Sequence, residues 1–136
     1  MSRPLSRCAF FLSLCSILCS VPTAANAGFT VKDDAGDDIV FDQPATRVVS
    51  LAPNLTELLF AAGAGDRVIA ADEYSDYPPA AKALPRIGNA YALDLERVLA
   101  LKPDLIVAWK SGSDARKVAR LRELGVRVFL TTQHVL

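Results

Sequence analysis

The feature that most constrains the fold is an alternation of strand-like and helical segments between Arg47 and Leu130. Four short apolar runs have the composition of buried strands: 48–51, 68–71, 105–109 and 126–130. Helical patterns lie between most of them: 54–62, 94–101 and 113–124. Strands that alternate with helices are typical of βαβ units, in which neighbouring strands run parallel. The predicted fold class is therefore α/β, a parallel sheet with flanking helices.

Short polar side chains mark the predicted starts of the helices. Asn54 is expected to cap the first helix, and Glu57, three residues on, completes a capping box. Asp94 is expected to cap the second helix, and Ser113 or Asp114 the third. The predicted inward-facing residues are Leu55, Leu58, Leu59 and Ala62 on the first helix and Val118, Leu121 and Leu124 on the third. The predicted helix-ending glycines are Gly63, Gly65 and Gly125.

A β-hairpin is predicted ahead of the sheet, with strands at 29–31 and 39–41 around an acidic turn. The turn holds four aspartates, which suit either a calcium site or a solvated turn: Asp33, Asp34, Asp37 and Asp38. No glutamate closes the segment at the spacing of an EF-hand, and Asp and Gly are common turn residues. We therefore predict a solvated turn and no metal site.

The N-terminal segment has the pattern of a secretory signal peptide. A basic head and an apolar run over residues 8–21 are followed by an Ala-Asn-Ala sequence that ends at Ala27. The apolar run is shorter than the ~20 residues of a membrane-spanning helix, although an uncleaved anchor is the alternative. We predict a signal peptide over 1–27, cleavage near Ala27, and a domain over 28–136.

The composition excludes several classes of function. Basic and acidic side chains balance at 15 each, whereas a general nucleic-acid-binding domain carries a basic excess. All three cysteines lie within the predicted signal peptide, and the only histidine is His134. A cysteine nucleophile, a Ser-His-Asp triad and a multi-histidine zinc site are therefore not expected. The phosphate-binding motif G-x-x-x-x-G-K-[ST] does not occur in the sequence, so no nucleotide is expected.

The loops after the strands hold the candidate binding residues, because ligands of open α/β sheets bind beyond the carboxyl ends of the strands. The candidates are Pro53, Asn54, Tyr74, Tyr77, Tyr91 and Trp109. Aromatic faces gathered at one edge suit a broad, partly apolar ligand. The alternative for each ring is packing under a loop. We favour packing for Tyr77, beside two prolines, and keep both interpretations open for Trp109.

A cluster of carboxylates offers a different function. Asp72, Glu73 and Asp76 follow the second predicted strand, where a carboxylate pair can act as acid and base in a small secreted hydrolase. Such clusters are more often solvated loops, so we favour a chain that is not an enzyme. A third possibility is an interaction domain that binds no small ligand.

Three segments carry a distinctive pattern: 47–58 (RVVSLAPNLTEL), 73–79 (EYSDYPP) and 94–109 (DLERVLALKPDLIVAW). Together they resemble the iron-siderophore, haem and cobalamin substrate-binding family of bacterial ABC importers. The LERVLALKPDLIV run is typical of the whole family, whereas YSDYPP and the AW pair are typical of its cobalamin branch. The resemblance extends from Arg47 to about Leu130.

The resemblance implies two Rossmann-like α/β lobes joined by a long helix, with the ligand held between them. Residues 28–136 correspond to the amino-terminal lobe, and the linker helix and second lobe are not among them. The implied function is capture of cobalamin (vitamin B12) or a related corrinoid in the periplasm. A monomer without cofactor would deliver this ligand to the permease subunits of an ABC importer. The alternative ligand is a ferric siderophore or haem, with Tyr74 or Tyr77 bound to iron.

The resemblance also implies roles for single residues. Tyr74 and Trp109 match aromatic residues that contact cobalamin, and Tyr91 stands beside Ala90, which takes the place of a family tryptophan. Glu96 matches the glutamate that pairs with permease arginines; its alternative role is to stabilise the first turn of its helix. Two rings that each bury on the order of 100 Å² would contribute about 5 kcal/mol. Micromolar binding needs about 8 kcal/mol, so we expect the lobe alone to bind weakly.

Overall fold

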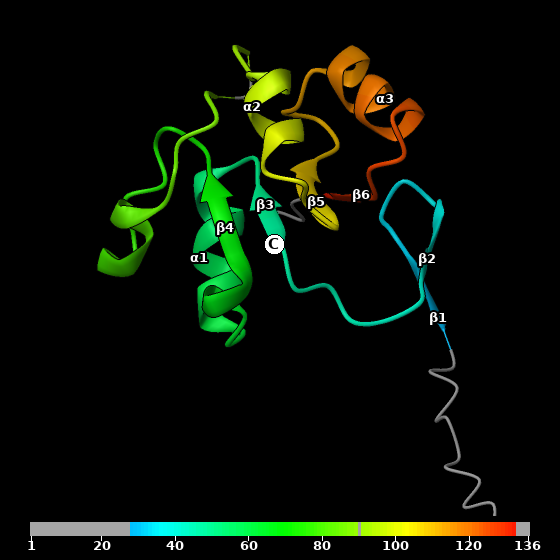
Figure 1. Cartoon of the computed structure of the whole chain (residues 1–136), viewed down its shortest axis with the longest axis horizontal. Helices are drawn as coiled ribbons and strands as arrows, with labels where there is room; N and C mark the ends of the chain where they lie inside the picture. The colour runs from blue at the N-terminus through cyan, green and yellow to red at the C-terminus, as the bar shows by residue number, and fades with distance from the viewer. Residues whose placement is uncertain (1–27, 90, 133–136) are drawn as a thin grey trace, which may run out of the picture.

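The predicted parallel sheet is present in the computed structural model, which describes residues 28–89 and 91–132. Its four strands are all parallel and lie in the order β4-β3-β5-β6 (Figure 1). They are β3 (Val48–Ser50), β4 (Val68–Ala71), β5 (Leu105–Trp109) and β6 (Val128–Thr131). The α/β prediction is confirmed. The predicted signal peptide over 1–27, Ala90 and His134 lie outside the described residues.

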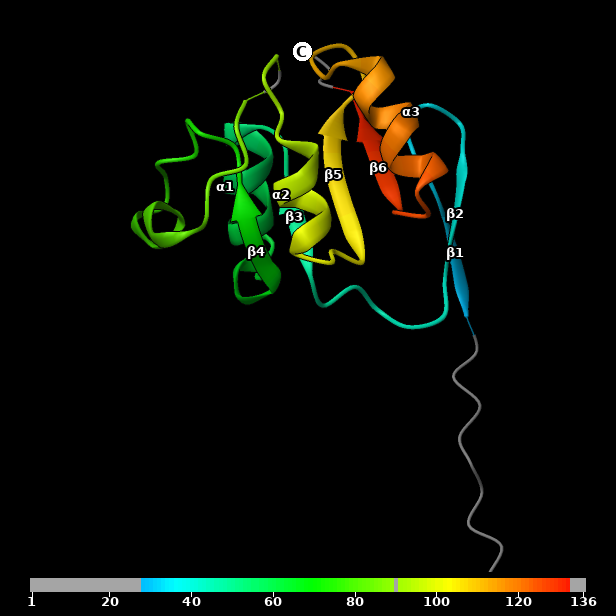
Figure 2. The same ribbon diagram turned by 45° about the horizontal axis from the view of Figure 1, so that its top comes forward.

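Among the described residues, three α-helices cover the two faces of the sheet. They are α1 (Pro53–Ala61), α2 (Leu95–Ala100) and α3 (Ala115–Glu123), with short 3₁₀ turns at η1 (Gly65–Arg67) and η2 (Pro79–Ala83). Figure 2 shows α2 and α3 on one face of the sheet and α1 on the other. Each helix or loop returns the chain to the same end of the sheet, so the segments that follow β3, β4 and β5 meet at one edge. Within the described ranges, no helix has the length and apolar character needed to cross a bilayer.

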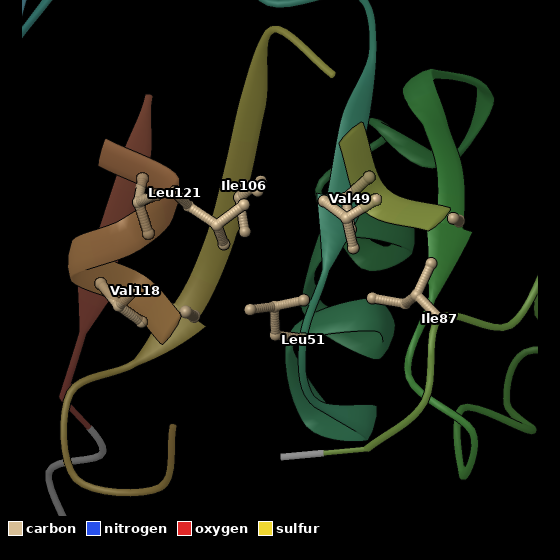
Figure 3. Close-up of a cluster of buried hydrophobic side chains, with 10 residues drawn as sticks. Val49, Leu51, Ile87, Ile106, Val118 and Leu121 are labelled. Atoms are coloured by element: carbon tan, nitrogen blue, oxygen red, sulfur yellow. The ribbon is translucent and has the colours of Figure 1, made fainter. Parts of the chain in front are cut away.

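The main core lies between the sheet and the layer of α2 and α3. In Figure 3, Val118 and Leu121 of α3 face Ile106 of β5. The cluster continues across the sheet and into the loops through Val49, Leu51, Ala70, Ile87, Val98, Ala108 and Val128. Alternate residues of β5 are buried, because Ile106 and Ala108 face this core whereas their neighbours face the other side.

The helix starts differ from the prediction in one case. Asn54 does not cap α1: the N-cap is Ala52, without a side-chain hydrogen bond, and Pro53 occupies the first turn. The capping-box prediction is wrong because proline, with its fixed φ and missing N–H, suits the first helical position. Asp94 and Asp114 do cap α2 and α3, each accepting a backbone N–H at 2.9 Å.

Two leucines predicted to face inward are exposed instead, Leu58 at 61% and Leu124 at 45%. In α1 only Leu55 and Thr56 are buried. The helix therefore packs on the sheet through a narrow strip of its surface, and its other side chains remain at least partly accessible to solvent. Leu124 lies after the last residue of α3, at its C-cap. Gly63 and Gly125 follow the helix ends with φ of 77° and 83°, as predicted for helix-ending glycines.

The predicted hairpin is formed by β1 (Phe29–Lys32) and β2 (Asp38–Phe41), paired antiparallel. Its turn is not simply solvated, because Asp33 is 4% exposed. The Asp33 carboxylate accepts N–H groups from Ala35, Asp37 and Leu130 and is ion-paired with Arg122. The solvated-turn prediction is therefore wrong for Asp33: this residue joins the hairpin to β6 and α3.

Candidate functional site

An open hollow of about 340 Å³ lies at the carboxyl ends of β3, β4 and β5. This is the edge at which open α/β sheets bind their ligands. The hollow is lined by Leu51, Ala52, Pro53, Asp72, Tyr74, Asn89, Tyr91, Trp109, Gly112 and Ser113. Four of the residues predicted from the sequence, Pro53, Tyr74, Tyr91 and Trp109, are thus brought together.

Tyr74 stands in the loop directly after β4. Its backbone N–H donates to Oδ1 of Asp72 at 2.8 Å, which closes a tight turn and fixes the direction of the loop. The residue is 65% exposed although it lines the hollow. When a ligand covers a large ring that is mostly exposed to water, the free energy of the complex is lowered.

Trp109 is the last residue of β5 and is half-buried. The turn that follows it passes close to the indole ring: a Cβ atom at Gly112 would lie 2.9 Å from Cε3 of Trp109. The absence of a side chain at Gly112 therefore allows the turn to pack on the ring. The N–H of Ser113 donates to the Trp109 carbonyl at 3.2 Å, which holds this turn in place.

Tyr91 is held by the loop between η2 and α2. Oδ1 of Asn89 accepts the N–H groups of Tyr91 and Ala92, each at 3.0 Å. The same loop is tied to the loop after β4, because the N–H of Glu73 donates to the Gly88 carbonyl at 2.8 Å. The Tyr91 side chain is 91% exposed, so its ring is presented to solvent rather than packed.

A buried hydroxyl network, which the sequence analysis missed, supports the hollow from below. Oγ1 of Thr56 lies 2.9 Å from Oγ of Ser50 and 2.8 Å from Oγ of Ser75. All three side chains are fully buried. They join β3, α1 and the loop after β4, so they fix Tyr74 relative to Pro53. The available signal was a serine inside an apolar strand run, since a buried hydroxyl needs a hydrogen-bond partner.

Three predicted candidates lie away from the hollow. Asn54 occupies the first turn of α1 and does not line the hollow, and its Oδ1 atom is enclosed without a hydrogen-bond partner. Tyr77 is 62% exposed and outside the hollow lining, so the prediction that its ring packs under a loop is wrong. Glu96 is exposed in the first turn of α2, and no ion pair is formed by it among the described residues.

The carboxylates after β4 have different environments. Asp72 is 3% exposed and lines the hollow, whereas Glu73 and Asp76 are exposed. Burial raises the pKa of Asp72; the Tyr74 N–H and the Arg86 charge oppose this rise, and Glu73 adds to it. No group of three or more His, Cys, Asp or Glu side chains in the described ranges is placed to hold a metal ion.

The sequence profile of the periplasmic binding protein family matches residues 48–135. A vitamin B12-binding protein of Vibrio cholerae is 50% identical over 86 residues, which are 63% of this chain and 31% of that protein. One from Yersinia pestis is 48% identical over 87 residues, 64% of this chain and 31% of that protein. The chain therefore spans about a third of the length of the curated relatives that it matches.

Two solved structures share the fold. The periplasmic vitamin B12 binding protein BtuF of Vibrio cholerae superposes with a TM-score of 0.62 at 49% identity, over 64% of this chain and 34% of that one. The periplasmic heme-binding protein RhuT of Roseiflexus superposes with a TM-score of 0.61 at 33% identity, over 65% and 34%. Both are binding proteins. Since the family profile covers well over half of the sequence, the chain belongs to the periplasmic binding protein family.

Proposed function

We propose that this chain forms one side of a periplasmic cobalamin-binding site, and that it delivers cobalamin or a related corrinoid to an ABC importer. One observation carries the proposal: Tyr74 and Tyr91, from two loops, and Trp109, at the end of β5, line one hollow together with Pro53. The two vitamin B12-binding relatives at about half identity support a corrinoid over other broad ligands. Export through the predicted signal peptide over 1–27 would place the site in the periplasm.

The hollow suits a large, flat ligand that it contacts on one side. Its volume of about 340 Å³ is near the lower limit of small-molecule pockets, ~300–1,000 Å³, so only part of a corrin ring enters it. Three rings that each bury on the order of 100 Å² contribute about 7 kcal/mol before the costs of association. Micromolar binding requires about 8 kcal/mol. We therefore expect this chain alone to bind cobalamin with a Kd above about 1 µM.

The proposed role is capture and release without bond chemistry. Of the three carboxylates considered for a hydrolase, only Asp72 lines the hollow. Asp76, the other member of a possible acid–base pair, is exposed outside the lining. Of these three carboxylates no pair lines the hollow, and a lining rich in aromatic rings favours binding of a broad ligand.

Glu96 is the proposed contact with the permease. It lies exposed in the first turn of α2, and its carboxylate forms no ion pair within the described ranges. Asp94 already caps this helix, so Glu96 is not needed as the capping group. An exposed charge of this kind contributes to association rate and orientation more than to affinity.

The proposal is tested by NMR of the ¹⁵N-labelled chain. Trp109 is the only tryptophan, so a single indole N–H resonance reports on the hollow. Titration with cyanocobalamin into the millimolar range is expected to shift this resonance saturably. Gallium protoporphyrin, a diamagnetic analogue of haem, serves as the comparator for the alternative ligand.

Two matched tyrosine variants complete the test. Tyr74→Ala is expected to weaken cobalamin binding by at least about tenfold, because it removes apolar contact area of roughly 100 Å². Tyr77→Ala removes an equally exposed ring three residues away, outside the hollow, and is expected to change the Kd less than about twofold. A saturable shift with gallium protoporphyrin alone would transfer the proposal to haem, and no shift with either compound would reject it.

A further inference from the structure

Asp72 is a buried acidic residue at the floor of the hollow. It follows β4 directly, and its N–H donates to the Ser50 carbonyl at 3.0 Å, which extends the pairing of β3 with β4 by one residue. Only 3% of its surface is exposed. The side chain lines the hollow and also an adjoining small cavity of about 10 Å³ beneath the loop that carries Asn89. Its position is therefore fixed by the sheet rather than by a mobile loop.

The two carboxylate oxygens of Asp72 differ in their contacts. Oδ1 accepts the Tyr74 N–H at 2.8 Å, whereas no hydrogen bond to Oδ2 is formed by the described residues. The only fully enclosed side-chain polar atom without a partner in the described part of the chain is Oδ1 of Asn54. Oδ2 of Asp72 is therefore not fully enclosed, and it remains an available hydrogen-bond acceptor on a residue that lines both the hollow and the adjoining cavity.

The cationic side chains around Asp72 already donate to carbonyl groups. Nη1 of Arg86 donates to the backbone carbonyls of Asp72 at 3.0 Å and Ser75 at 2.8 Å. Nζ of Lys117, which lines the adjoining cavity, donates to the carbonyl of Leu93 at 3.0 Å. Neither cation hydrogen-bonds Oδ2. Glu73 adds negative charge beside Asp72, and the capping Asp114 lines the same adjoining cavity.

We propose that Oδ2 of Asp72 selects the ligand of the hollow, by accepting an N–H from a primary amide at the ligand's rim and disfavouring a carboxylate there. This inference rests on the proposed corrinoid function and specifies how the ligand is chosen. The rim of a cobalamin corrin carries primary amides, whereas the rim of haem carries carboxylates. Both rings offer apolar faces to Tyr74 and Trp109, so the aromatic side chains alone do not separate them.

The physical basis is that a buried acceptor favours a ligand group that donates a hydrogen bond and disfavours one that does not. A ligand amide that reaches Oδ2 forms a hydrogen bond to a charged group, whereas a ligand carboxylate at the same point meets like charge in a poorly solvated site. A site built to hydrogen-bond one group rejects an analogue that leaves its buried polar atom unpaired. Discrimination then combines attraction for one rim group with repulsion of the other.

The test compares two corrinoids with the same ring. Dicyano-cobyrinic acid heptaamide carries amides around the rim, and dicyano-cobyrinic acid carries carboxylates. The Kd of each is measured from the Trp109 indole resonance of the ¹⁵N-labelled chain. The unchanged chain is expected to bind the amide form at least about tenfold more tightly, the effect of one hydrogen bond to a charged group.

Asp72→Asn is expected to reduce this preference by about tenfold or more. Asparagine keeps an oxygen for the Tyr74 N–H but presents an amide N–H₂ to the hollow, which favours a carboxylate. Asp72→Ser, which has no charge and a shorter reach, is the second variant and is expected to lose the preference as well. Asp76→Asn removes one negative charge from a nearby exposed residue outside the lining and is the matched control, with an expected change below about twofold.

Each possible outcome either supports the inference or overturns it. A preference that falls in both Asp72 variants and persists in Asp76→Asn supports the inference. Binding of both corrinoids with the same preference in the unchanged chain and in the Asp72 variants would overturn it and leave the proposed function standing. An equal loss in Asp76→Asn would also overturn it, since the cause would then be general charge. Binding of neither corrinoid would reject the proposed function together with this inference.

Discussion

Arg122 of α3 donates from Nη2 to Oδ2 of Asp33 at 3.1 Å, an ion pair between residues 89 positions apart in the chain. The Asp33 side chain is fully buried, and 35% of the Arg122 side chain is exposed. The same carboxylate accepts backbone N–H groups from the hairpin turn and from β6. This contact fixes the hairpin against the edge of the sheet opposite the β4 side.

Asp33→Asn is therefore expected to lower the free energy of unfolding by about 2–3 kcal/mol, the contribution of hydrogen bonds to a charged group. Urea unfolding at pH 7 measures the change. Asp37→Asn is the control, since Asp37 contacts the same Arg122 at 2.7 Å with a side chain 55% exposed; its expected cost is under about 1 kcal/mol. Equal costs for the two variants would contradict the structural role of Asp33.

The Asp33 contribution is expected to disappear in acid. Burial alone would raise the pKa of Asp33, but the N–H groups of Asp37, Leu130 and Ala35 and the Arg122 charge outweigh it, and the pKa lies below its ordinary 3.8. The stabilisation is complete above 3.8, the value in the unfolded chain, and is lost as the pH falls through the folded-state pKa. The difference in unfolding free energy between Asp33→Asn and the unchanged chain should shrink over that interval. A difference independent of pH would contradict this assignment.

Asp72 is expected to behave in the opposite direction. Burial raises its pKa above 3.8, so the ionised carboxylate lowers the stability of the folded chain at neutral pH. Asp72→Asn should therefore increase the free energy of unfolding at pH 7, and the gain should fall as the pH decreases through the folded-state pKa toward 3.8. Urea unfolding between pH 3 and pH 8 measures both signs. A loss of stability at pH 7 would contradict the account of Asp72 as a strained acceptor kept for ligand selection.

The strands were predictable because their signal is local. The apolar runs at 105–109 and 68–71 match β5 and β4 in full, since buried parallel strands are continuous apolar segments bounded by turns. Asp94 was predictable as a cap for the same reason, because the cap and the N–H it accepts lie three residues apart. The βαβ connections predict only part of the strand order. The position of the hairpin beside the sheet cannot be predicted from the sequence pattern.

The residues that were mispredicted depend on contacts distant in the sequence. The local sequence predicts that Asp33 is a solvated turn residue. Its burial depends on Arg122 and Leu130, which are distant in the sequence. Leu58 is spaced as an inward-facing residue of a helix, but it is exposed because the sheet covers only part of α1. The extent of that cover cannot be predicted from local sequence. In the candidate site, the aromatic residues were predictable from their place after strands. The roles of Ser75 and Asp72 were not, because Ser75 depends on its contact with Thr56 of α1 and Asp72 on its pairing with Ser50 of β3.

Gly112→Ala is expected to displace the Trp109 ring. A Cβ at this position would lie 2.9 Å from Cε3 of Trp109, so the ring or the turn must move, at a cost of about 1–3 kcal/mol. The indole N–H resonance of the unliganded chain should shift, and the affinity for cyanocobalamin should fall several-fold. Ser111→Ala, one residue away and exposed, should leave both unchanged. An unaltered indole resonance in Gly112→Ala would show that the turn does not position the ring.

Glu96→Arg is expected to impair docking while cobalamin binding by the hollow is retained. The measurement is association of the chain with a vitamin B12 permease in lipid nanodiscs. The association rate constant should fall by about tenfold at low ionic strength, and the difference should shrink at high salt. Glu57→Arg makes the same charge change on α1 and is the control. If Glu57→Arg lowered the association rate constant as much as Glu96→Arg, the cause would be the change in net charge and not the loss of docking at Glu96.

The central claim is that a corrinoid binds in the hollow formed by the loops after β3, β4 and β5. The most direct test is to follow all backbone and indole N–H resonances of the ¹⁵N-labelled chain during titration with cyanocobalamin. The account predicts saturable shifts confined to residues 51–52, 72–75, 88–89, 91–92 and 109–113. Shifts centred on the hairpin or on α1, or no saturable shifts at millimolar cyanocobalamin, would contradict it.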